Sequence, residues 1–152
     1  MTGYMEEMRK LVGHRTIIQC AASIICVDQD GRMLLGRRSD NHKWGYSGGA
    51  VEIDERAEDC ARRELLEEMG LIAETLDFFY VNSGPETHYI YPNGDEVSNI
   101  EVVYLCRRYH GTLRPQESEM EELRFFEPAE IELSAISPPI RPVMDRLLRM
   151  IR

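Results

Sequence analysis

The sequence lacks several patterns that mark common protein classes. Its four cysteines, Cys20, Cys26, Cys60 and Cys106, form no Cys-x-x-Cys pair and no zinc-finger spacing, and its four histidines show no ligand spacing. No secretory leader precedes the cysteines, so we expect reduced thiols and a cytoplasmic location. No apolar run approaches the roughly 20 residues that a membrane-spanning helix needs, so no membrane association is expected.

Positive charge is also scarce. Lys and Arg number 18 against 27 Asp and Glu, which leaves a formal net charge of −9. Binding along a nucleic-acid backbone depends on many Lys and Arg side chains that displace counterions, so this balance argues against DNA binding. An acidic protein that handles phosphates must use cations locally, either a few basic side chains or bound metal ions.

The remaining composition is that of a globular protein. Apolar residues make up 43% of the 152 residues and charged residues 30%, and there are no repeats, linkers or low-complexity stretches. A chain of this length can bury a core of its own. We therefore expect one domain over residues 1–152.

Periodicity predicts a mixture of helices and strands. A helix with an apolar stripe is expected over 4–11, where it packs on the domain or on a second subunit of a homodimer. An apolar run over 16–27 predicts a strand buried on both faces, joined through the Asp28–Gly31 turn in a hairpin with a strand over 33–38. The remaining expected elements are a helix from Arg56, strands over 74–81, 89–91, 100–107 and 123–126, and a closing helix over 139–151. The fold class is mixed α/β, with helices on both sides of a mixed sheet.

Three carboxylates share one face of the helix that begins near Arg56. Glu64, Glu67 and Glu68 stand at i, i+3 and i+4. Like charges at this spacing destabilise a helix by about 0.2–0.5 kcal/mol per pair, which favours a bound cation at the site. Mg²⁺ and Mn²⁺ prefer carboxylate oxygens and retain positions for water and phosphate. Taken alone, the triplet is more typical of a solvated acidic helix face than of a metal site.

The surroundings of the triplet favour the metal site. Gly48-Gly49 permits a tight turn and close approach of the main chain to a ligand. Arg63 lies beside the acidic face, and Glu55 stands at the helix start, where the helix dipole favours a carboxylate.

The segment 49–71, GAVEIDERAEDCARRELLEEMGL, resembles the Nudix box, G-x5-E-x7-R-E-U-x-E-E-x-G-U with U aliphatic. The match holds at every fixed position: Gly49, Glu55, Arg63, Glu64, Leu65, Glu67, Glu68, Gly70 and Leu71. One departure precedes the box, where Ser47 replaces the proline that is common in the family; we expect it only to loosen the turn slightly.

The resemblance implies an α/β/α sandwich that hydrolyses the pyrophosphate bond of a nucleoside diphosphate linked to a group X, with Mg²⁺ or Mn²⁺. It implies that Glu64, Glu67 and Glu68 hold the metal together with the Gly49 carbonyl, and that Arg63 pairs with Glu55. Either Glu67 or Glu68 would accept a proton from the attacking water. Clustered carboxylates titrate as a set, so the sequence does not decide between the two.

A further glutamate is expected from the acidic cluster at 117–122. Many family members supply a catalytic or metal-binding Glu from this part of the chain, and spacing back from the strand at 123–126 selects Glu119. The alternative is that the cluster is surface charge on an exposed loop.

The substrate is less constrained. Pro85 and Tyr89 stand near positions that family members use for ADP-ribose and for dinucleoside polyphosphates, and nucleoside triphosphates are a third class. Trp44 could stack a base, and His88 or Arg107 could meet a phosphate or a base. Each also has a structural explanation, as a loop, strand or core residue. An RNA 5′ pyrophosphohydrolase and a non-catalytic nucleotide sensor are the alternative functions.

Overall fold

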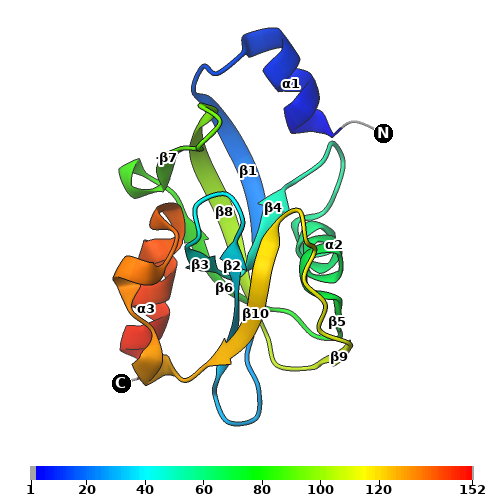
Figure 1. Cartoon of the computed structure of the whole chain (residues 1–152). Coiled ribbons are helices and arrows are strands. Elements are labelled where there is room, and N and C mark those ends of the chain that lie inside the picture. The colour runs from blue at the N-terminus through cyan, green and yellow to red at the C-terminus, as the bar shows by residue number, and fades with distance from the viewer. Residues whose placement is uncertain (1–2, 152) are drawn as a thin grey trace.

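A mixed five-stranded sheet forms the centre of the computed structural model, which describes residues 3–151 (Figure 1). Its order is β4-β1-β8-β6, with β7 also paired to β8. The neighbours β1 and β8 run parallel, and the other pairs are antiparallel. The strands are β1 (Ile17–Cys26), β4 (Ser47–Ala50), β6 (Asp77–Asn82), β7 (His88–Ile90) and β8 (Glu96–Cys106).

Within the described residues, two smaller sheets, three α-helices and four short 3-10 helices accompany the central sheet. One sheet has the order β10-β2-β3, with β10 (Met120–Phe126), β2 (Met33–Arg38) and β3 (Trp44–Gly45). The other pairs β5 (Leu71–Ala73) with β9 (Tyr109–Gly111). The helices are α1 (Tyr4–Val12), α2 (Ala57–Met69) and α3 (Arg141–Ile151). Within residues 3–151, no helix has both the length and the apolarity needed to cross a bilayer.

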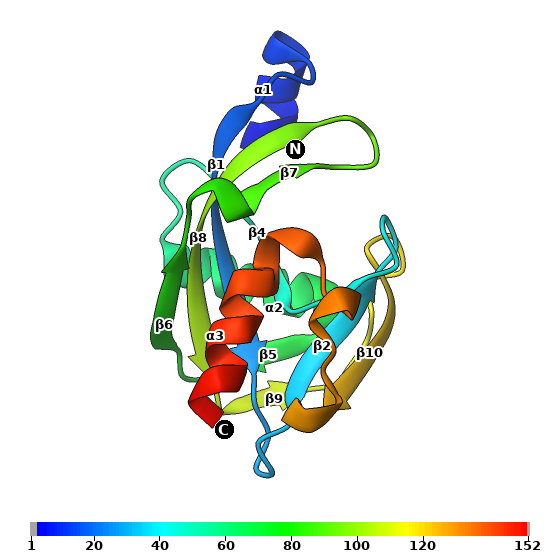
Figure 2. The same ribbon diagram turned by 90° about the vertical axis from the view of Figure 1, so that its left-hand side faces the viewer.

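The helices α2 and α3 cover opposite faces of the central sheet (Figure 2). Side chains alternate between the two faces of a strand, so Ile24 of β1 packs with Leu65 of α2, whereas its neighbour Ile25 packs with Val143 and Met144 of α3. The apolar stripe expected on α2 is therefore buried. The predicted mixed α/β class, with helices on both sides of the sheet, is confirmed.

Two expectations about the first strands were wrong. No hairpin joins β1 to β2, because both edges of β1 are already paired, with β4 on one side and β8 on the other. An isolated Val27–Met33 bridge and the Asp28–Arg32 main-chain bond link their ends, but the ladder goes no further, and β2 pairs with β10 and β3 instead. The first half of β1 is also not buried: Ile18 is 73% exposed, because α2 and α3 cover only the second half.

Candidate functional site

The two glycines that precede the acidic helix lie in β4, against β1. Gly48 pairs with Ser23 and Gly49 with Ala22. A Cβ at Gly48 would collide with the Ser23 side chain, and a Cβ at Gly49 would collide with the carboxyl group of Glu64. Glycine at these positions therefore lets the main chain approach the carboxylates of α2 closely.

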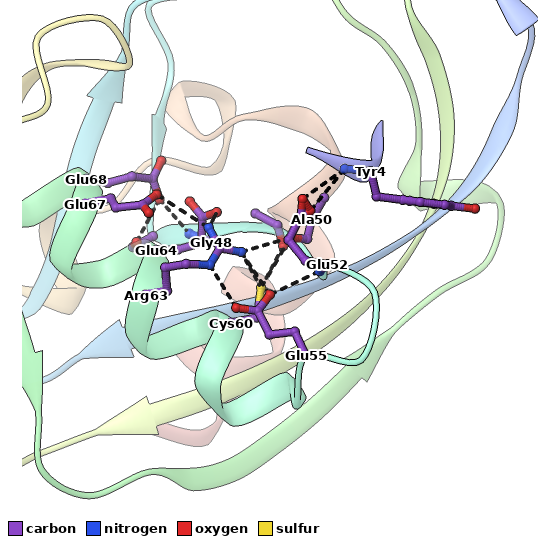
Figure 3. Close-up of polar contacts among 12 residues, drawn as sticks. Tyr4, Gly48, Ala50, Glu52, Glu55, Cys60, Arg63, Glu64, Glu67 and Glu68 are labelled. Carbon is purple, nitrogen blue, oxygen red and sulfur yellow. Dashed lines mark hydrogen bonds and ion pairs between the residues drawn. The ribbon is translucent and has the colours of Figure 1, made fainter. Parts of the chain in front are cut away.

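Arg63 connects the loop before α2 to the acidic face of that helix (Figure 3). Its Nε and Nη2 donate to the two oxygens of Glu55 at 2.8 and 3.0 Å, and Nη1 donates to Glu64 at 2.8 Å. A weaker bond of 3.5 Å reaches Glu67. The Arg63 hydrogen bond lowers the pKa of Glu55, and Glu55 in turn raises the pKa of Arg63. The Arg63 guanidinium thus forms charge-assisted hydrogen bonds with the carboxylates of Glu55 and Glu64.

Glu68 is the buried carboxylate of the site. Only 5% of the residue is exposed, and its Oε1 accepts hydrogen bonds from Ser47 Oγ at 2.8 Å and from the Gly48 amide at 3.0 Å. Burial, followed by the negative charge of Glu64, raises the pKa of Glu68 to about 8. Ser47 therefore does more than loosen a turn, since its hydroxyl orients Glu68.

Glu64 lies in the same environment. Burial is the main cause that raises its pKa, and Glu67 and Glu119 add to the effect while Arg63 opposes it. The carboxylates of Glu64 and Glu68 are thus desolvated and repel one another. These are the conditions that a bound cation relieves.

The donor chemistry fits a divalent metal ion. Glu64, Glu68 and the Gly49 carbonyl supply only oxygen atoms, and Glu67 on the next turn is half exposed. Within the described range 3–151, no three or more His, Cys, Asp or Glu side chains stand in a geometry that could hold a metal ion. The Glu64 carboxylate instead accepts a hydrogen bond from Arg63, and the Glu68 carboxylate accepts hydrogen bonds from Ser47 and Gly48. The metal ligands therefore remain a prediction.

Glu119 lies in the loop before β10. Its carbonyl accepts from the Ser39 amide at 3.0 Å, and nearby the Gln116 amide donates to the Glu68 carbonyl at 3.0 Å. Its charge contributes to the raised pKa of Glu64, after the effect of burial. Glu121 of the same acidic cluster instead pairs with Arg37 at 2.8 Å. The Glu121 side chain is thus engaged in an ion pair, and a role for Glu119 in the site stays a prediction.

A cleft opens beside Gly48 and Gly49. Polar and aromatic side chains from several strands line it, including Gln19, Ser23, Arg38, Tyr46, Tyr89, Tyr91, Asn99 and Glu101. Tyr89 and Tyr91 form an edge-to-face pair with centroids 5.0 Å apart, and the Tyr89 hydroxyl accepts from Asn41 at 3.0 Å. Of the substrate-binding residues proposed from the sequence, the structure brings only Tyr89 to this cleft.

Arg38 and Glu101 are cleft residues that the sequence analysis missed. Arg38 makes a two-pronged pair with Asp40 at 2.8 and 2.9 Å. Glu101 is 6% exposed and accepts from Ser23 Oγ at 2.5 Å, Tyr46 Oη at 3.1 Å and Asn82 Nδ2 at 3.1 Å. Burial raises its pKa despite these bonds. The available signal for Glu101 was a single acidic residue inside the apolar run IEVVYLC. Glutamate is rarely buried unless its carboxylate has polar partners, so such a residue points to a buried polar site.

Trp44 and Arg107 lie elsewhere. The Trp44 ring packs edge-on against Phe126, with centroids 4.8 Å apart, in the sheet formed by β2, β3 and β10. Arg107 follows the end of β8, about 20 Å along the strand direction from Glu101, and pairs with Asp77 at 3.8 Å. The structure does not bring either side chain to the cleft, and their binding roles stay predictions.

Comparison with known proteins gives consistent matches. The family model of the NUDIX domain matches residues 18–147. Nucleoside triphosphatase NudI of Escherichia coli is 30% identical over 94 residues, which cover 55% of this chain and 67% of that protein. An oxidized purine nucleoside triphosphate hydrolase of Danio rerio is 46% identical over 57 residues, 36% of each chain. The match thus spans only about a third of that relative's length.

Solved structures share the fold. A MutT NUDIX hydrolase from Burkholderia pseudomallei superposes with a TM-score of 0.72 at 24% identity, over 86% of this chain and 98% of that chain. The E. coli ORF135 protein gives a TM-score of 0.67 at 26% identity, over 90% of this chain and 94% of that chain.

Proposed function

Since this chain belongs to the Nudix hydrolase family, we propose that it hydrolyses the pyrophosphate bond of a nucleoside diphosphate linked to a group X, with nucleoside triphosphates as the substrate class. The NudI and Danio rerio relatives are both named as enzymes that hydrolyse nucleoside triphosphates. These names support nucleoside triphosphates over ADP-ribose and dinucleoside polyphosphates. We propose Mg²⁺ or Mn²⁺ as the cofactor, held by Glu64, Glu67, Glu68 and the Gly49 carbonyl.

One observation carries the proposal. Glu64 and Glu68 lie largely buried on one face of α2, close to Gly49 and Gly48, and these two glycines line a cleft that Arg38 also lines. A structural acidic face would leave both carboxylates in water, where they repel less. The arrangement suits a site that receives cations and a polyanionic substrate together.

The residues divide the chemistry between them. A water oxygen forms a bond to phosphorus, the anhydride P–O bond breaks, and the departing phosphate takes the electron pair; Glu67 or Glu68 accepts the proton of the water. When bound, the metal neutralises charge on the phosphate oxygens and lowers the pKa of the attacking water. Arg38 offers a fixed guanidinium to the phosphates, and Arg63 holds Glu64 and Glu55 in register. We propose Glu119, in the loop before β10, as a further acidic group of the site.

The test is a substrate panel. Nucleoside triphosphates, including oxidised purines, would be assayed beside ADP-ribose, a diadenosine polyphosphate and 5′-triphosphorylated RNA, with Mg²⁺, with Mn²⁺ and with a chelator. We expect the highest kcat/KM for a nucleoside triphosphate, with monophosphate and pyrophosphate as products. Preferred turnover of RNA would establish the alternative enzyme. Nucleotide binding without any phosphate release, with either metal, would indicate a sensor and refute the proposal.

A further inference from the structure

The helix α1 lies outside the matched family domain, which begins at residue 18. None of its residues is fully buried, so the core does not hold it firmly in place. It sits at the end of the central sheet, between the β7–β8 hairpin and the loop before α2 (Figures 1 and 2). Polar bonds at its two ends fix its position.

The first anchor joins α1 to the loop of the Nudix box. Both carboxylate oxygens of Glu52 accept from the Tyr4 amide, at 3.0 and 3.2 Å, and so cap the helix N-terminus (Figure 3). The Glu52 amide in turn donates to Glu55 Oε1 at 3.1 Å. Glu55 holds Arg63, which holds Glu64. A continuous chain of bonds therefore runs from α1 to a predicted metal ligand.

The second anchor joins α1 to the hairpin formed by β7 and β8. Arg9 Nη1 donates to the carbonyls of Gly13 and Arg15 at 3.0 and 2.7 Å, and Nη2 donates to the Glu96 carbonyl at 2.7 Å. Its Nε lies 3.7 Å from Asp95. Two of these partners, Asp95 and Glu96, lie at the end of the turn that follows Tyr91.

The β7–β8 hairpin, to which Arg9 is hydrogen-bonded, forms one wall of the cleft. Tyr89 and Tyr91, on its first arm, both line the cleft, and the Tyr91 amide bonds the Asp95 carbonyl at 2.8 Å. A shift of residues 95 and 96 is therefore transmitted to the two tyrosines. The guanidinium fork reaches three carbonyls and a carboxylate at once, which a lysine ammonium does not reproduce.

We propose that α1 is a positioning element of the active site: through Glu52 it fixes the loop that orients Glu64, and through Arg9 it fixes the cleft wall that carries Tyr89 and Tyr91. The assignment of a catalytic consequence rests on the proposed function. Arg9 and Glu52 are positioning residues, because they act through other protein groups.

The test separates the two anchors with full-length variants. Glu52→Ala removes the carboxylate that caps α1, whereas Glu52→Gln supplies a neutral hydrogen-bond acceptor in its place. Arg9→Lys keeps the positive charge but lacks the branched guanidinium group. Lys10→Ala, an exposed cation on the same helix, is the matched control. The measurements are kcat and KM for the preferred nucleotide, Mn²⁺ binding, and amide hydrogen exchange at Glu55, Tyr91 and the core of α2.

The expected results differ between the anchors. Arg9→Lys should raise KM about tenfold with little change in kcat, because the cleft wall moves, and should speed exchange at Tyr91. Glu52→Ala should weaken Mn²⁺ binding about tenfold and lower kcat with little change in KM, and should speed exchange at Glu55. Glu52→Gln should recover part of this loss, and Lys10→Ala should match the wild type.

Unchanged KM, kcat and Mn²⁺ binding in Arg9→Lys and Glu52→Ala would overturn the inference, even if melting temperatures fell, because α1 would then only add stability. If the wild type released no phosphate from any nucleotide, the proposed function would fail. Mn²⁺ binding and exchange would still decide the role of α1: normal values in the variants overturn it, and selective loss supports it.

Discussion

Gly49→Ala tests the close approach between β4 and the predicted metal-binding face of α2. A Cβ at this position would lie 2.8 Å from Glu64 Oε2 and closer still to the Cδ and Oε1 atoms of Glu64, well inside van der Waals contact. The backbone of Gly49 does not have a positive φ, so alanine brings no conformational strain of its own. The side chain that must give way is the flexible end of Glu64.

The effect on activity should therefore exceed the effect on stability. Displacement of a catalytic group by roughly an ångström can lower a rate by about a hundredfold, and we expect kcat of Gly49→Ala to fall by about that factor. The metal concentration for half-maximal rate should rise, as it should in Glu64→Gln. The assay is a titration of pyrophosphate release with Mg²⁺, together with a urea unfolding curve.

Gly31→Ala is the matched control. Gly31 has a φ of 79° and open space where a Cβ would stand, in the turn between β1 and β2. Alanine there should cost about 1–2 kcal/mol of stability through backbone strain and leave kcat unchanged. Wild-type kcat and metal dependence in Gly49→Ala would refute the reasoning, because Glu64 would then not be needed where the structure places it.

Four further substitutions address single residues. Glu68→Gln should lower kcat by about two to four orders of magnitude with the fold intact, in steady-state kinetics and circular dichroism; near-normal turnover would remove Glu68 from the site. Glu119→Gln should lower kcat at least about tenfold while Glu117→Gln changes little, and equal kinetics for both would assign the loop to surface charge. Arg63→Ala should reduce kcat and weaken Mg²⁺ binding, because Glu64 loses its charge-assisted bond; an unchanged metal titration would contradict this. Glu101→Gln should flatten the pH dependence of stability. The raised pKa lets folded Glu101 keep a proton that the unfolded chain releases above its ordinary pKa of 4.5, so the free energy of unfolding falls as pH rises from there, by at most about 1.4 kcal/mol per pH unit. Denaturation between pH 4 and 8, without nucleotide, measures the slope, and equal slopes in both proteins would show that Glu101 does not titrate there.

The predictions that succeeded were mostly local in the sequence. Ala61, Leu65 and Met69 are spaced four residues apart, so they lie on one stripe of the helix regardless of how the rest of the chain folds. All three are buried. The Arg63–Glu55 pair, expected from the family resemblance, is present because a turn and two helical turns bring the two side chains together. Family and fold class also followed from a contiguous segment.

The sequence by itself determined the acidic helix, the glycines before it and the cluster of carboxylates from which a cation site is predicted. Only the tertiary structure decided which strands pair with β1, why Ser47 matters and which residues line the cleft. Strand pairing depends on which edges are already occupied, and no local pattern records this. Arg38, Glu101 and Tyr91 come from separate strands and meet only because the chain folds around the sheet, whereas Trp44, close to the box in sequence, packs against Phe126 instead. Side-chain spacing within one element is fixed by backbone geometry, but contacts between elements are fixed by the packing of the whole chain.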